Sequence, residues 1–221
     1  MGENQFKFKL NAVVIPFVMV FVIWFVYWIE YYFHTNFNNY GIFPKSIKGL
    51  RGIFFSPFIH SSTQHLFNNS VPLAVMLWAL YYFYNKIANV ILFGGLLLTG
   101  ILTWSFARPS FHIGASGVVY LLVSFIFFSG VFRKYYRLIA LSLTVVFLYG
   151  SMIWYIFPME DKISWEGHLS GFIVGFVFAY LYKNKGPKPE QFQFSENKEF
   201  EELFDENGNF VPPEEISEDV E

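Results

Sequence analysis

Long apolar stretches alternate with short polar connections along most of this chain. A helix needs about 20 apolar residues to cross the core of a bilayer. Four uncharged stretches reach that length and a fifth is marginal. In order, they are residues 10–29, 87–107, 109–132, 138–159 and, apart from one histidine, 167–182. The uncharged region 52–85 conceals a further span, with its apolar part near 66–84.

This pattern predicts an all-α, polytopic membrane protein with a bundle of six transmembrane helices. The predicted helices cover residues 10–32, 65–84, 87–106, 115–131, 138–157 and 168–182. The first is too long for the core of a signal peptide, so we expect it to be retained. The connection 33–60 is the longest, and its aromatic content predicts that it lies in the membrane interface.

Basic residues orient the bundle. Nine lysines and arginines fall in the segments on the same side of the membrane as residues 1–9. Five fall in the segments on the opposite side. Because basic residues concentrate on the cytoplasmic side, we predict that both termini are cytoplasmic. The chain then consists of a short N-terminus (1–9), a membrane domain (10–182) and a cytoplasmic tail (183–221).

Composition supports a membrane protein and excludes several functions. Hydrophobic residues make up 54% of the chain and charged residues 14%, whereas soluble domains carry nearer a quarter charged residues. The net charge of −2 gives no electrostatic reason to bind nucleic acid. The absence of cysteine excludes disulfides, thiolate metal sites and a cysteine nucleophile.

The tail differs sharply from the membrane domain. It holds 12 of the 17 acidic residues and is expected to be largely disordered. Residues 197–206 (NKEFEELFDE) fit a short amphipathic helix that binds a partner. A solvated acidic tail is the simpler interpretation.

Polar residues in the membrane domain are candidates for function because they are costly in lipid. His65 and Asn69 are four residues apart, so they share one face of a helix. His60 lies about 140° round from His65 and therefore belongs where the loop enters the helix. The glutamate of a zinc-binding helix is missing, so polar contacts between helices are the simplest explanation of this stretch alone.

Two further clusters involve glycine. Gly114-Ala115-Ser116-Gly117 opens the fourth predicted helix, where free N–H groups favour a developing negative charge near Ser116. Tyr120 follows one turn later and is placed to pack on a histidine ring. His168, Gly171 and Gly175 share one face of the sixth helix, and these glycines allow a neighbouring helix to approach closely. Each cluster alone also fits ordinary helix packing.

Together and in this order, the clusters resemble the rhomboid family of intramembrane serine proteases. The family's second helix begins with two histidines and an asparagine at the spacing of His60, His65 and Asn69. Its fourth helix begins Gly-x-Ser-Gly, and its sixth carries a histidine followed by glycines three and seven residues later. Many members have Trp-Arg in the first loop; here Leu50-Arg51 stands nearest, without a tryptophan.

The resemblance implies a role for each residue. Ser116 would be the nucleophile and His168 the general base. Asn69, His65 and the Ser116 N–H would form the oxyanion hole. The residues with supporting roles would be Tyr120, His60, Gly114, Gly117, Gly171 and Gly175. No metal or cofactor is implied.

The implied function is hydrolysis of single-span transmembrane substrates in the lipid bilayer, in a bacterial plasma (inner) membrane. One alternative is a catalytically inactive rhomboid-like protein that binds membrane clients, although this chain has both the serine and the histidine. Another is a transporter with a histidine proton relay, which leaves Gly114–Gly117 unexplained.

Overall fold

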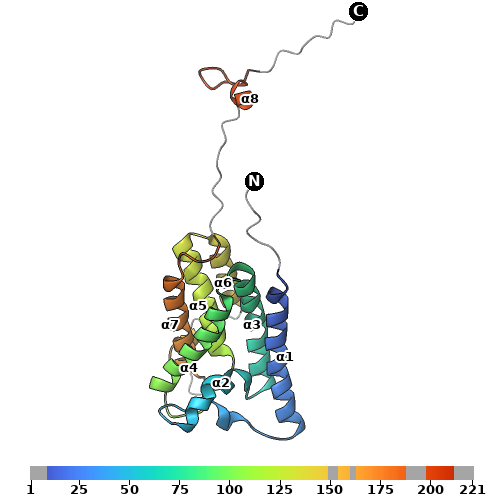
Figure 1. Cartoon of the computed structure of the whole chain (residues 1–221), viewed down its shortest axis with the longest axis vertical. Helices are drawn as coiled ribbons and strands as arrows, with labels where there is room; N and C mark the ends of the chain where they lie inside the picture. Colours follow the sequence, from blue (N-terminus) through green and yellow to red (C-terminus); the bar gives the residue numbers. More distant parts are fainter. Residues whose placement is uncertain (1–8, 149–153, 160–162, 188–197, 212–221) are drawn as a thin grey trace, which may run out of the picture. The chain divides into compact units, whose positions relative to one another are not determined.

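The computed structural model is helical and describes residues 9–148, 154–159, 163–187 and 198–211 (Figure 1). The chain divides into two units, Met1–Pro189 and Glu190–Glu221. In the described parts of the chain, the only β-type pairings are two isolated bridges, so the predicted all-α class is confirmed.

Six longer helices lie in the described part of the first unit, close to the positions predicted. They are α1 (Asn11–Tyr32), α3 (Thr63–Phe83), α4 (Gly95–Phe106), α5 (Ser116–Arg133), α6 (Tyr136–Leu148) and α7 (Trp165–Leu181). One π-helical turn, Val90–Gly94, precedes α4.

Three of these helices, α1, α3 and α5, are long and apolar enough to cross a membrane. Residues 90–106 and α6 form shorter apolar helices, so the count of six spans stays a prediction. The fifth predicted helix, 138–157, includes residues 149–153, which lie outside the described residues, and a 3₁₀ turn at Trp154–Ile156.

The first connection is built from four short turns. They are η1 (Asn38–Tyr40), η2 (Lys48–Arg51), α2 (Gly52–Phe55) and η3 (Ser56–Phe58). Arg51 fastens the connection internally, because its guanidinium lies 4.3 Å from the centre of the Tyr40 ring and donates to the Asn39 carbonyl at 3.0 Å. An antiparallel bridge between Ile42 and His112 ties the connection to the segment before α5.

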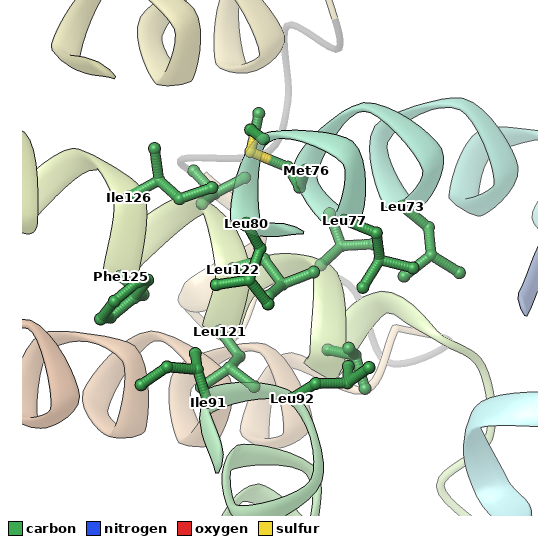
Figure 2. Packing of buried hydrophobic residues seen from close by; sticks show 14 of the residues in the cluster. Leu73, Met76, Leu77, Leu80, Ile91, Leu92, Leu121, Leu122, Phe125 and Ile126 are labelled. Atoms are coloured by element: carbon green, nitrogen blue, oxygen red, sulfur yellow. The ribbon is translucent and has the colours of Figure 1, made fainter. Parts of the chain in front are cut away.

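Helix α5 lies at the centre of the first unit and packs against α3, α4, α6 and α7. Fully buried side chains from α3, the π-helical turn and α5 meet in the core (Figure 2). Leu77, Leu92 and Leu121 are examples, each with no exposed surface or 1%. The apolar side chains of α1, in contrast, are mostly exposed, as expected of a lipid-facing helix.

The described part of the second unit is a small local fold. Helix α8 covers Lys198–Glu201, and a bridge then pairs Phe204 with Phe210 around Gly208, whose φ is +79°. In the chain alone the helix stops at Glu201, and the suggestion that residues 197–206 form a helix on a partner stays a prediction. The physical reason for the stop is the sequence Asp-Glu-Asn-Gly-Asn, because the Asp205 carboxylate accepts bonds from the backbone N–H of Asn209 and favours a turn.

Candidate functional site

Ser116 is the first residue of α5, and Gly114 controls the turn that places it there. Gly114 has a φ of +105°, a conformation that side chains disfavour. A Cβ at this position would also lie only 2.7 Å from His65 Nε2. The Gly114 N–H donates to the Ser56 carbonyl at 2.8 Å, which anchors the turn to the first connection.

His168 lies one turn inside α7, because the helix begins at Trp165 rather than at the predicted residue 168. The imidazole is buried. Its Nε2 is 2.8 Å from Ser116 Oγ, and its Nδ1 is 2.8 Å from the carbonyl oxygen of Tyr155. The structure therefore brings together a serine and a histidine that are 52 residues apart in the sequence.

The Tyr155 carbonyl determines which imidazole nitrogen carries the proton. A carbonyl oxygen can only accept, so Nδ1 must donate to it. Nε2 is then an acceptor and takes the hydrogen bond from the Ser116 hydroxyl. Sequence reasoning missed this contact because a backbone carbonyl leaves no signal in the sequence.

Tyr120 holds the plane of the imidazole. Its ring is stacked on the His168 ring, with centroids 4.3 Å apart and an interplanar angle of 13°. The contact follows from the sequence spacing, since Tyr120 comes one helical turn after Ser116 and projects from the same side of α5.

His65 and Asn69 border the backbone just before Ser116. A Cβ built on Gly114 would lie 2.7 Å from His65 Nε2 and 3.6 Å from Asn69 Nδ2. Asn69 Nδ2 donates to the His65 carbonyl at 3.1 Å and has a second N–H available. The Ser62 hydroxyl caps α3 by accepting from the His65 N–H, which explains where this helix begins.

His60 lies outside α3, in the loop that precedes it, as predicted. Its ring still contacts His65, with centroids 5.0 Å apart, because the loop folds back over the helix end. Its Nε2 accepts from the Ala115 N–H at 3.4 Å. Burial lowers the pKa of His60 to about 3, so this side chain stays neutral and supports the loop as an acceptor.

The glycines mark close approach between α5 and its neighbours. A Cβ on Gly171 would lie 2.1 Å from the Gly117 carbonyl oxygen, and one on Gly175 would lie 2.3 Å from the Leu121 carbonyl oxygen. A Cβ on Gly117 would in turn lie 3.3 Å from the Gly167 carbonyl oxygen. These contacts leave no space for side chains and bring α7 against α5 at the level of Ser116 and His168.

A cavity of about 1100 Å³ adjoins the serine and histidine. Its lining includes Ser116, His168, Tyr120, His65, Asn69 and His112. It is therefore large enough for an extended peptide segment. Within the described ranges, no cluster of three or more His, Cys, Asp or Glu residues could hold a metal ion.

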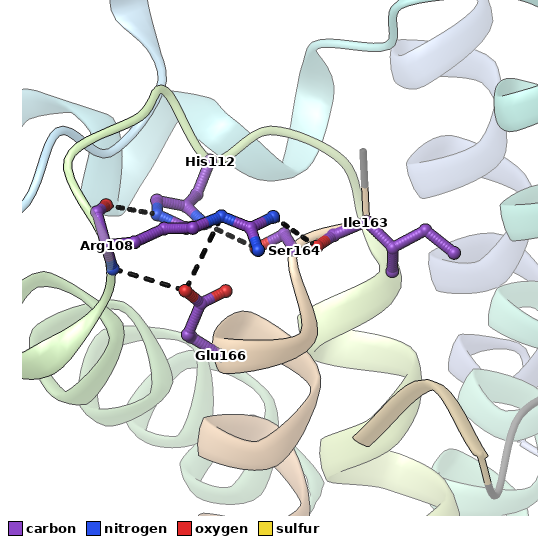
Figure 3. Close-up of polar contacts among 5 residues, drawn as sticks. All are labelled: Arg108, His112, Ile163, Ser164 and Glu166. Carbon is purple, nitrogen blue, oxygen red and sulfur yellow. Dashed lines mark hydrogen bonds and ion pairs between the residues drawn. The ribbon is translucent and has the colours of Figure 1, made fainter. Parts of the chain in front are cut away.

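A second polar cluster, which sequence reasoning missed, contains Glu166 together with Arg108, His112 and Ser164 (Figure 3), and the last three of these residues also line the cavity. Glu166 Oε1 accepts from the Arg108 N–H at 3.2 Å and lies 3.7 Å from Arg108 Nε. His112 Nδ1 is 2.6 Å from Ser164 Oγ, and its Nε2 is 3.1 Å from the Arg108 carbonyl oxygen. Burial lowers the pKa of His112. The sequence placed these residues in separate connections, so only their charge could have drawn attention to them.

Comparisons with known proteins agree with this architecture. The family model of the rhomboid domain matches residues 48–185. Uncharacterized proteins of Mycobacterium bovis and Mycobacterium tuberculosis are 35% identical over 155 residues, which cover 64% of this chain and 62% of each relative. An uncharacterized protein of Mycobacterium leprae is 36% identical over 155 residues, 65% of this chain and 61% of the relative. The chain thus spans about three fifths of the length of these relatives.

Proposed function

This chain belongs to the rhomboid family, whose domain model matches more than half of its length, and from this premise we propose that it is an intramembrane serine protease. Ser116 is the proposed nucleophile and His168 the proposed general base. The observation that carries the proposal is the 2.8 Å contact between Ser116 Oγ and His168 Nε2, in the tautomer that can accept the serine proton.

In the proposed acylation step, Ser116 Oγ attacks the carbonyl carbon of the scissile peptide while its proton moves to His168 Nε2. The resulting oxyanion is stabilised by the Asn69 amide, the His65 imidazole and the Ser116 N–H. The C–N bond then breaks, and His168 returns the proton to the leaving amine. An acyl ester on Ser116 remains.

Water completes the reaction by attacking this ester. His168 takes a proton from the water, and the second tetrahedral intermediate collapses to release the acid and restore the Ser116 hydroxyl. The Nδ1–H of His168 donates to the Tyr155 carbonyl throughout. That bond and the stacked Tyr120 ring orient the imidazole, the task that a carboxylate performs in a three-residue serine protease.

We propose single-span transmembrane proteins as substrates. The helical composition supports an integral membrane protein, and the excess of basic residues in the proposed inside segments supports cytoplasmic termini and a site toward the outer face. Water can reach a site near that face without crossing the bilayer. We further propose that the protein is located in the plasma membrane of a bacterium. We also propose that its acidic tail binds a protein partner.

The proposal is tested by substitution and by labelling. Ser116→Ala and His168→Ala should each abolish cleavage of a model transmembrane substrate, with little change in thermal stability, because losing either member of such a pair costs many orders of magnitude in rate. A fluorophosphonate probe should label wild type at Ser116. Normal cleavage by Ser116→Ala would overturn the assignment, and a folded wild type without cleavage or labelling would favour the inactive client-binding alternative.

A further inference from the structure

Glu166 is a buried carboxylate two residues before His168. Its side chain is 2% exposed. Oε1 accepts from the Arg108 N–H, while Oε2 has no hydrogen-bond partner in the part of the chain that the structure describes. Burying a carboxylate with one oxygen unpaired costs folding free energy. Glu166 is therefore better explained by a role in the site than by a gain in stability.

Arg108 begins the segment that leads to Ser116. It lies two residues after the end of α4, and residues 109–115 then run to the first residue of α5. The Arg108 guanidinium also donates to the Ile163 carbonyl at 2.6 Å. Arg108 thus contacts the chain on both sides of the α7 start, through its backbone and through its side chain.

His112 provides a second link between the same two segments (Figure 3). It contacts Ser164, the residue just before α7, through Nδ1, and the Arg108 carbonyl through Nε2. Ser164 stands at the N-cap of α7, yet its hydroxyl makes no capping bond. The Ser164 hydroxyl instead contacts His112, in the loop that leads to Ser116.

We propose that Glu166 is a positioning residue for the Ser116–His168 pair, and this inference rests on the proposed protease function. Glu166 and His168 lie in the first turns of one helix, so their backbones move together. By holding the Arg108 N–H, the carboxylate fixes the loop that ends at Ser116 against the helix that carries His168. Chain geometry, rather than direct contact, connects Glu166 to the reacting atoms.

The ion pair itself adds little stability. The Arg108 side chain is 31% exposed and its Nε lies 3.7 Å from the carboxylate, so solvent screens the attraction. The hydrogen bond to the Arg108 N–H needs an acceptor oxygen at the right reach, which a neutral amide also supplies, although a carboxylate accepts more strongly. The inference therefore predicts that the shape of residue 166 matters more than its charge.

Three variants separate shape from charge. Glu166→Gln keeps the length and an acceptor oxygen, Glu166→Asp keeps the charge but is shorter, and Glu166→Met keeps the volume without an acceptor. Ser124→Ala is the matched control, because Ser124 Oγ donates to the Phe172 carbonyl at 2.7 Å across the same α5–α7 interface, away from the pair. For each protein, kcat and KM on a model transmembrane substrate, the rate of fluorophosphonate labelling and the thermal midpoint are measured.

The final extent of fluorophosphonate labelling gives the number of intact sites in each sample. We therefore express kcat per labelled site. We expect kcat and the labelling rate of Glu166→Gln to stay close to wild type. In Glu166→Met they should fall about 10- to 100-fold at unchanged KM, since a shift near 1 Å in a reacting pair has an effect of that size. The kcat and labelling rate of Glu166→Asp should be intermediate between those of Glu166→Gln and Glu166→Met. Ser124→Ala should lower the thermal midpoint and leave kcat per site unchanged.

The results that overturn the inference differ from those that overturn the proposed function. If wild type cleaves and labels but Glu166→Met matches Glu166→Gln, the positioning role is wrong and the protease assignment stands. Activity that follows charge, with Glu166→Asp above Glu166→Gln, overturns the role as well. If Glu166→Met does not fold, the order of Glu166→Gln and Glu166→Asp alone decides. A wild type that neither cleaves nor labels overturns both.

Discussion

A single methyl group at Gly171 should reveal how closely the chemistry depends on helix packing. In the wild-type structure, an added Cβ would lie 2.1 Å from the Gly117 carbonyl oxygen and 3.0 Å from the Leu121 nitrogen. Both neighbours are backbone atoms of α5, so no side chain can rotate away. Ordinary contact begins near 3.4 Å, which means that the helices must separate by more than about 1 Å.

That separation acts on both members of the proposed catalytic pair. Gly117 follows Ser116 directly, and Gly171 is one turn after His168. Gly171→Ala should therefore lengthen the 2.8 Å contact and lower kcat by about 100-fold, the effect of a displacement near 1 Å. Overpacking of this kind should also cost about 1–3 kcal/mol in the free energy of unfolding. Gly171→Val should have a larger effect in the same direction.

The assay combines thermal unfolding in detergent with turnover of a model transmembrane substrate. Gly94→Ala is the matched control, because its added Cβ would lie 3.7 Å from the nearest atom, in the Phe178 ring. We expect the control to resemble wild type in both measurements. If Gly171→Ala is as stable and as active as Gly94→Ala, the α5–α7 contact does not set the distance between serine and histidine, and the reasoning fails.

The remaining predictions concern the oxyanion, acid stability and topology. Asn69→Ala should lower kcat by about 100- to 1,000-fold but retain weakened fluorophosphonate labelling; unchanged turnover and labelling would make Asn69 a packing residue. Because the pKa of His60 falls from 6.5 to about 3 on folding, the unfolded chain binds the extra proton, and stability should decrease as pH drops below about 6.5. His60→Gln should flatten this dependence in thermal unfolding, and equal slopes would contradict it. In intact cells, cysteine at residue 162 should react with an impermeant maleimide, while cysteine at Lys134 or at residue 214 should react only after lysis; the reverse pattern would invert the protein. Residues 162 and 214 lie outside the described residues.

Helix positions and the candidate residues were readable from the sequence because their causes are local. A span in lipid must satisfy its own backbone and present apolar side chains, so α1 and α5 appear as long apolar runs, whereas polar residues in the first turns of α3 shorten its run. The spacing of His168 and Gly171 puts both on one helical face wherever that helix packs. The start of α7 was predicted too late because Glu166 is charged, and a charge ends an apolar run even where the folded chain buries it.

Tertiary structure decided which distant atoms meet. The Tyr155 carbonyl fixes the tautomer of His168, and no side-chain pattern can announce a backbone acceptor. The contact between His60 and His65 required the loop to fold back, which the helical wheel does not describe. Arg108 and Glu166 are 58 residues apart and meet only because α4 and α7 pack side by side. The sequence determined the helices and the residue types of the site because both follow from local chemistry. Distances, tautomer and burial depend on long-range packing, which is set only when the helices assemble.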